Sequence, residues 1–126
     1  MAIHGQAAQL LRSEVWWVNF DPSLGGEVQK TRPAVIVSNN ASNKALNRVQ
    51  VVPITSRVDR VYPCEALVML NGEVRKAMAD QLTTVSKLRF GARLGLVNEP
   101  DMQLIDAAIG IQLGIAAAPW RRGSAR

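Results

Sequence analysis

Three short stretches hold the residues that could contact a phosphate, and the first of them centres on Arg32. In "KTRPAVIVS" this arginine stands directly before Pro33 and a continuous apolar run. Proline restricts the preceding residue to extended geometry, so the guanidinium would leave the chain from a fixed point. Its planar set of donors suits phosphate. The alternative is a surface arginine in a partial salt bridge, and the local sequence alone favours that alternative.

Two further stretches present hydroxyl and amide groups beside apolar runs. "PITSR" places Thr55, Ser56 and Arg57 where a strand would end, so they could hold a phosphodiester or could satisfy their own loop backbone. "ADQLTTVS" places Asp80 and Gln81 between two apolar runs, where Gln81 could contact a base edge or both residues could brace a turn. Each stretch alone leaves both interpretations open.

The scarcity of cysteine and histidine restricts the possible chemistry. Cys64 is the only cysteine and His4 the only histidine, so an intrachain disulfide is excluded and a zinc site is not expected. His4 lies near the N-terminus, in a segment where we expect no order, and a thiol nucleophile needs an activating base. There is also no glycine-rich phosphate loop. We therefore expect no cofactor and no metal, and any phosphodiester cleavage would proceed without metal and without histidine.

Most of the net positive charge lies outside the predicted domain. The chain has a formal net charge of +5, from 15 Lys and Arg residues and 10 Asp and Glu residues. Arg12, Arg121, Arg122 and Arg126 lie outside residues 13–117, whereas all 10 acidic residues lie within that span. Composition thus permits nucleic-acid binding without demonstrating it.

The elements that would position these residues are mostly strands. Apolar runs rich in β-branched and aromatic residues predict strands over 14–20, 33–38, 48–54, 65–70 and 73–79, with two shorter strands in "TTVS" and "RLGLV". Trp16 and Trp17 would face opposite sides of the first strand, one of them filling the core. Pro33 would be the first residue of its strand, where no ladder donor is needed. Asn71-Gly72 predicts a tight hairpin.

A single helix follows the strands. Asn98, Pro100 and Asp101 mark its start, and apolar residues then recur at helical spacing up to Leu113. The 126 residues suffice for one domain with one core, which we expect over residues 13–117, between a flexible arm (1–12) and a basic tail (118–126). The fold class is mainly β with a C-terminal helix, as a small, strongly bent barrel or sandwich. No stretch is long enough to span a bilayer and the start is not a convincing signal peptide, so we expect a cytoplasmic protein.

Taken together, these stretches resemble one known family. "SEVWWVNFDP", "GGEVQKTRPAVIVSNN", "VQVVPITSR", "ADQLTTVSKLRFGARLG" and "DMQLIDAAIGIQLGI" follow one another as in the MazF/PemK toxins of bacterial type II toxin–antitoxin systems. The resemblance covers residues 13–115. It implies an SH3-like barrel of the CcdB/MazF type and a homodimeric, sequence-specific endoribonuclease that cuts single-stranded RNA by attack of a ribose 2′-hydroxyl. A cyclic phosphate and a 5′-hydroxyl would result.

The resemblance also assigns roles to particular residues. It implies that Arg32 and Thr55 are catalytic, and we expect RNA to be bound by a further set: Glu27, Lys30, Ser56, Arg57 and Gln81. The implied partners are a MazE-like antitoxin, a second copy of the chain, and operator DNA bound only as the toxin–antitoxin complex. A gyrase poison of the CcdB kind remains an alternative, although Trp120 is followed by Arg-Arg-Gly rather than by the Gly-Ile of that ending. A non-catalytic nucleic-acid-binding barrel is the other alternative.

Overall fold

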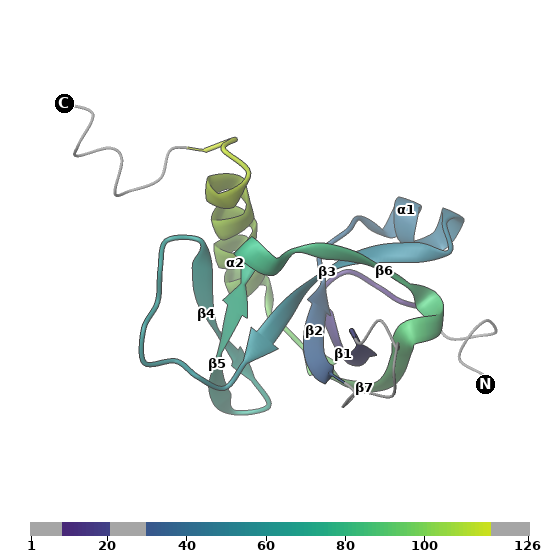
Figure 1. Cartoon of the computed structure of the whole chain (residues 1–126), viewed down its shortest axis with the longest axis horizontal. Helices are drawn as coiled ribbons and strands as arrows, with labels where there is room; N and C mark the ends of the chain where they lie inside the picture. The colour runs from purple at the N-terminus through teal and green to yellow at the C-terminus, as the bar shows by residue number, and fades with distance from the viewer. Residues whose placement is uncertain (1–8, 21–29, 117–126) are drawn as a thin grey trace.

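The computed structural model describes residues 9–20 and 30–116, and Figure 1 shows how their strands and helices are arranged. In chain order the elements are β1 (Glu14–Asn19), β2 (Thr31–Ile36), α1 (Asn40–Ala45), β3 (Arg48–Thr55), β4 (Glu65–Leu70), β5 (Glu73–Met78), η1 (Ala79–Gln81), β6 (Thr83–Ser86), η2 (Lys87–Arg89), β7 (Phe90–Leu96) and α2 (Glu99–Gln112). The predicted mainly β fold with a C-terminal helix is confirmed. None of the helices in the described ranges has the length and apolar character needed to cross a membrane.

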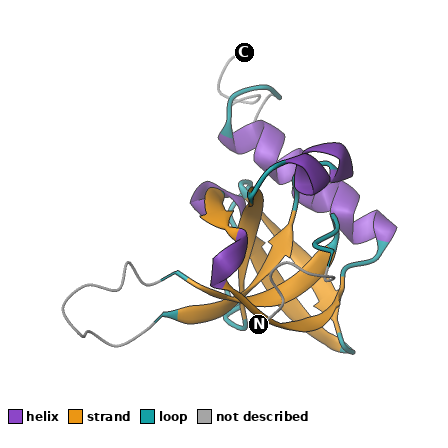
Figure 2. Ribbon diagram, turned by 90° about the vertical axis from the view of Figure 1, so that its right-hand side faces the viewer, coloured by secondary structure: helices purple, strands orange, loops and turns teal. Residues whose placement is uncertain are grey.

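The strands form one antiparallel sheet that β3 divides into two parts. The order is β4-β5-β3-β2-β1-β7, and β6 also pairs with β3. The first half of β3 (48–51) pairs with β6, whereas its end, Ile54 and Thr55, pairs with β5. Because β3 has different neighbours at its two ends, the sheet curls strongly, as Figure 2 shows. The end of β3 is therefore the place where the two parts of the sheet meet.

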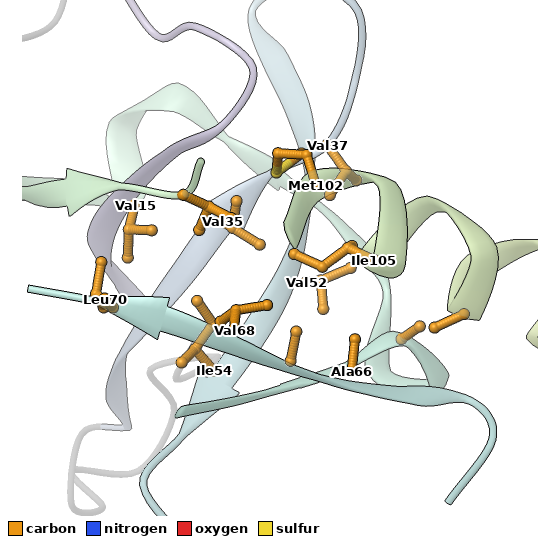
Figure 3. Packing of buried hydrophobic residues seen from close by; sticks show 14 residues of the cluster. Val15, Val35, Val37, Val52, Ile54, Ala66, Val68, Leu70, Met102 and Ile105 are labelled. Atoms are coloured by element: carbon orange, nitrogen blue, oxygen red, sulfur yellow. The ribbon is translucent and has the colours of Figure 1, made fainter. Parts of the chain in front are cut away.

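One face of the sheet is covered by α2. Met102, Ile105 and Ala108 form the buried side of this helix, and they pack on strand residues such as Val35 and Val52 (Figure 3). Asn98 caps the helix by accepting a hydrogen bond from the Asp101 N–H at 2.8 Å, which satisfies one of the free donors of the first turn.

The opposite face encloses a second apolar cluster inside the curl. Trp16 and Phe90 meet there edge to face, with ring centroids 6.1 Å apart. Trp17, its neighbour in the chain, is 38% exposed, so the predicted division of the two tryptophans between core and exterior is confirmed.

The predicted hairpin is also confirmed. Asn71 and Gly72 join β4 to β5 with φ angles of 52° and 83°, as a two-residue turn with both central residues in the left-handed region requires. This short turn fixes the register of β5 against β4, in which Leu67 pairs with Lys76. It thereby helps to place Lys76 beside the end of β3.

Two details of the sequence interpretation were wrong. β2 begins at Thr31, so Pro33 is its third residue and Arg32 lies within the strand. Pro33 pairs with Trp17 of β1 on one side. On the other side, the pairing of β2 with β3 begins only at Ala34. Pro33 therefore lies where one edge of its strand is unpaired, a position that proline tolerates.

The second difference concerns the arm predicted over residues 1–12. Leu10 is buried in the second cluster, and the Arg12 guanidinium bonds the Val37 carbonyl and both carboxylate oxygens of Asp106. Residues 10–12 therefore pack on the domain.

Candidate active site

Three polar side chains form a row across neighbouring strands where the two parts of the sheet meet. Thr55 of β3 lies directly opposite Lys76 of β5. On its other side, β3 pairs with β2 only from Ala34↔Pro53 onward. Arg32 and Thr55 lie just beyond that pairing and line the same hollow. Directly opposed residues of an antiparallel pair project from the same face. Thr55 and Lys76 therefore share a face, and with Arg32 they form a row of three polar side chains along one hollow.

Arg32 lies between two surface hollows. The Gln81 hollow, of about 340 Å³, is lined by Phe20, Lys30, Arg32, Pro53, Gln81 and Thr83. The Tyr62 hollow, of about 440 Å³, is lined by Arg32, Thr55, Arg57, Asp59, Arg60, Tyr62, Lys76 and Met78. Of the residues that the structure describes, Arg32 alone contributes to both. Its side chain is exposed and has no ion-pair partner among the described residues, so its donors are available for a ligand that extends from one hollow into the other.

The charge of the two hollows favours an anion. Among the described residues that line the Tyr62 hollow, three arginines from β2 and the loop between β3 and β4 stand against one carboxylate, Asp59, while the charge of Lys76 is paired with Glu65. Lys30 adds a further cation in the Gln81 hollow. A strongly cationic groove of this kind attracts phosphates. Within the described ranges, no group of three or more His, Cys, Asp or Glu side chains is arranged to hold a metal ion.

Thr55 is held in one orientation by the turn that follows it. Its hydroxyl oxygen accepts a hydrogen bond from the Arg57 N–H at 3.2 Å, a local bond of the kind that Ser and Thr make at strand ends. A hydroxyl that accepts one bond still has its own proton to donate. Thr55 can therefore donate to an oxygen bound beside Arg32, while Arg57 is directed into the same hollow.

Lys76 is the buried member of the row. Its ammonium donates to the Arg60 carbonyl at 2.7 Å and lies 3.3 Å from the Glu65 carboxylate. The two charged side chains are only 11% and 10% exposed. An ion pair this buried survives when each charge also has hydrogen bonds, and Glu65 accepts one from the Tyr62 N–H at 2.9 Å. The pair thus fastens the β3–β4 loop, which forms the wide teal-blue loop at the left of Figure 1, to β5.

The structure brings most of the predicted site residues together. Arg32, Thr55 and Arg57 line one hollow, and Lys30 and Gln81 line the other. Ser56 is exposed but is not among the described residues that line either hollow, so its role in RNA binding stays a prediction. Glu27 lies outside the described residues.

Sequence reasoning missed Arg60, Tyr62 and Lys76, which all line the Tyr62 hollow. Arg60 and Tyr62 stand in a polar loop with no local pattern to distinguish them, and Lys76 enters the site only through its pairing with Thr55. The Arg60 guanidinium donates to the Tyr62 hydroxyl at 3.1 Å, and this hydrogen bond raises the pKa of Arg60 above its ordinary value.

Cys64 adjoins this region but is unsuited to nucleophilic chemistry. Burial, and then the negative charge of Asp80, raise the pKa of its thiol. A raised pKa keeps the thiol protonated, whereas a nucleophile needs the thiolate. The low expectation for a cysteine nucleophile is thus supported by the electrostatics of the site.

Comparison with known proteins identifies the family. The model of the "PemK-like, MazF-like toxin of type II toxin-antitoxin system" family matches residues 11–113. The chain belongs to this family. Among curated PemK/MazF relatives, endoribonuclease MazF9 of Mycobacterium tuberculosis is 32% identical over 113 residues, covering 82% of this chain and 96% of its own. The endoribonuclease toxin MazF of Escherichia coli K12 is 36% identical over 101 residues, covering 78% and 88%.

Solved structures agree with this PemK/MazF assignment. An endoribonuclease in complex with its cognate antitoxin, from a mycobacterial species, superposes with a TM-score of 0.69 at 30% identity. The match covers 84% of this chain and 96% of that one. The expected CcdB/MazF-type fold is therefore confirmed, and the family match begins at residue 11, in the segment that the structure shows packed on the domain.

Proposed function

We propose that this chain is the toxin of a type II toxin–antitoxin pair and acts as a metal-independent endoribonuclease on single-stranded RNA. It would cut at a specific short sequence, by attack of a ribose 2′-hydroxyl, and so inhibit translation and growth. The observation that carries the proposal is the position of Arg32, unpaired among the described residues, beside Thr55 and between two cationic hollows. The relatives named as endoribonucleases support the same activity.

The reaction needs a nucleophile, a charge stabiliser and a leaving group, and RNA itself supplies the first and last. The 2′-oxygen forms a bond to the adjacent phosphorus as its proton is lost. The bond from phosphorus to the 5′-oxygen then breaks, and that oxygen takes up a proton. A 2′,3′-cyclic phosphate and a 5′-hydroxyl are left, with atoms and charge in balance.

Arg32 would stabilise the charge that develops on the non-bridging oxygens. Arginine stays protonated at any ordinary pH, so its principal contribution is a planar set of donors aimed at the phosphorane. Thr55 would donate a hydrogen bond to the same phosphate or orient the 2′-hydroxyl. Holding the attacking and leaving oxygens in line, with one nucleotide on each side of Arg32, would supply much of the remaining rate enhancement.

The proposed partners follow from the family and from its solved structures. One mycobacterial relative was solved with its cognate antitoxin, and other matched structures are MazE-MazF complexes from Deinococcus radiodurans. We propose that this chain forms a homodimer in the cytoplasm and is silenced by a MazE-like antitoxin that covers the cationic hollows. Operator DNA would be bound only by the toxin–antitoxin complex.

The test is incubation of purified protein with a long mixed-sequence RNA in the presence of EDTA. Discrete cuts at one short motif are expected, and Arg32→Ala should abolish them while the folded dimer persists. Arg48→Ala is a matched control, because Arg48 is exposed at the opposite end of β3 and should cut normally. Intact RNA in every reaction, with inhibited DNA supercoiling, would instead support a gyrase poison.

A further inference from the structure

Tyr62 is the one aromatic residue among the described residues that line the Tyr62 hollow. The residue is 49% exposed, although a large aromatic residue of a folded domain normally buries more of its surface. It faces the same hollow as Arg32 and Thr55, the residues placed at the cleaved phosphate. The ring is therefore both available to a ligand and close to the proposed chemistry.

The residues around Tyr62 hold it in place before any ligand arrives. Its hydroxyl accepts a hydrogen bond from Arg60 at 3.1 Å. Its backbone N–H donates to the Glu65 carboxylate at 2.9 Å, and its carbonyl accepts from the Glu65 N–H at 2.8 Å. Glu65 is paired with Lys76, which also bonds the Arg60 carbonyl. Both ends of the Arg60–Tyr62 segment are thus tied to the buried ion pair.

A half-exposed aromatic ring in a cationic hollow suits a nucleobase. Bases of single-stranded RNA stack on aromatic side chains and on arginine planes, and the cations around the ring would hold the phosphates on either side. A volume of about 440 Å³ is also within the range of small-ligand sites. An aromatic ring contributes little to the binding of phosphate alone, whereas it provides a surface on which a base can stack.

We propose that Tyr62 is the stacking platform for a base adjacent to the cleaved phosphate, and that Lys76 and Glu65 are the residues that position it. This inference rests on the proposed endoribonuclease activity and adds a base subsite to it. Since the backbone that carries the ring is fixed in advance, the loop loses less conformational freedom on binding RNA than a mobile loop would.

The first test measures cleavage kinetics of Tyr62 variants on an RNA that contains the mapped cut site. Loss of one stacked base lowers affinity roughly 5- to 150-fold, so Tyr62→Ala should raise KM by that factor with kcat little changed. Tyr62→Phe keeps the ring and should stay within about threefold of wild type, whereas Tyr62→Leu keeps apolar area without a ring and should resemble Tyr62→Ala. Val61→Ala is the matched control, because Val61 is 42% exposed in the same loop but does not line the hollow.

Three kinetic outcomes would overturn the inference. The first is an unchanged KM in Tyr62→Ala, and the second is a Tyr62→Leu enzyme as good as Tyr62→Phe. The third is an equal loss in Val61→Ala, which would indicate general disruption of the loop. A wild-type protein that cuts no RNA contradicts the proposed function instead, so the two failures are distinguishable.

The second test does not depend on cleavage. Tyr62 is the only tyrosine of the chain, so protein labelled with 3-fluorotyrosine gives a single ¹⁹F resonance from this ring. A pool of 2′-O-methyl oligoribonucleotides, which cannot be cut by 2′-hydroxyl attack, should shift that resonance through the ring currents of the stacked base. An abasic oligomer of the same length should bind through its phosphates to the cationic side chains of the hollow and leave the ¹⁹F resonance unshifted. Equal shifts from both oligomers, or none from the pool at concentrations that saturate binding, would refute the stacking role.

Discussion

Replacing Lys76 by methionine tests whether the buried ion pair supports the site. Methionine fills a similar volume but leaves the Glu65 carboxylate, 10% exposed, without its cation. Removing one partner of a buried pair costs ~3–5 kcal/mol. Because Glu65 would still accept a hydrogen bond from the Tyr62 N–H, we expect the lower end of that range, about 3 kcal/mol. For a domain of this size, such a loss lowers Tm by roughly 10–15 °C.

The double variant Lys76→Met/Glu65→Gln separates the charge from the hydrogen bond. Glutamine keeps an oxygen that can accept from the Tyr62 N–H, and the uncompensated buried charge is gone. We therefore expect the double variant to be more stable than Lys76→Met alone, by ~1–3 kcal/mol. Urea unfolding should be followed at one fixed protomer concentration, because subunit association contributes to the apparent stability of a dimer.

Two results would refute this reasoning. If Lys76→Met unfolds within about 0.5 kcal/mol of the wild-type protein, the pair contributes no more than an exposed one. If Glu65→Gln adds its own cost to that of Lys76→Met, rather than offsetting it, the destabilisation has another origin than the buried charge. Hydrogen exchange at the Tyr62 amide then shows whether the β3–β4 loop has opened in Lys76→Met, as its lost anchor predicts.

Three further changes test separate parts of the structure. Thr55→Val removes the hydroxyl at nearly constant volume and should lower kcat/KM for RNA cleavage roughly 10- to 150-fold, as loss of a hydrogen bond to a charged group does; an unchanged rate would exclude Thr55 from the chemistry. The pKa of Cys64 is raised by burial. Its alkylation by iodoacetamide should therefore reach half-maximal rate at a higher pH in folded protein than in urea. A half-maximal rate at a lower pH in the folded protein would contradict that electrostatic account. Gly72→Ala should lower the free energy of unfolding by ~1–2 kcal/mol. The cause is the φ angle of +83°, because no atom lies within 4 Å of the added Cβ. Gly91→Ala, whose added Cβ meets its nearest atom at 3.6 Å, should lower it clearly less in the same unfolding assay.

Local patterns in the sequence predicted the elements well. The turn chemistry of Asn71-Gly72 and the capping group of Asn98 are encoded in neighbouring residues, and the structure has both features where they were expected. Period-two alternation also predicted that Trp16 and Trp17 face opposite sides of β1, and the structure has Trp16 buried and Trp17 exposed. Short-range physics determines these features, so a single sequence contains enough information.

The composition of the site depended on long-range pairing, which local patterns do not contain. Arg32, Thr55 and Lys76 come from three strands, and only the pairing of β2 and β5 with β3 brings them to one hollow. A lysine within a strand normally lies at the surface, so no local pattern indicates the buried Lys76–Glu65 pair. The prediction of Arg32 and Thr55 as catalytic residues came from the family resemblance rather than from local sequence.

The central claim is that the 2′-hydroxyl of RNA is the nucleophile at Arg32. Once the cut site is mapped, one oligoribonucleotide should be made twice, with ribose and with a single deoxyribose at the cleaved position. The account predicts that both bind with similar affinity, that only the ribose form is cut, and that mass spectrometry of its 5′ fragment shows a 2′,3′-cyclic phosphate. Cleavage of the deoxyribose form at the normal rate would contradict the account.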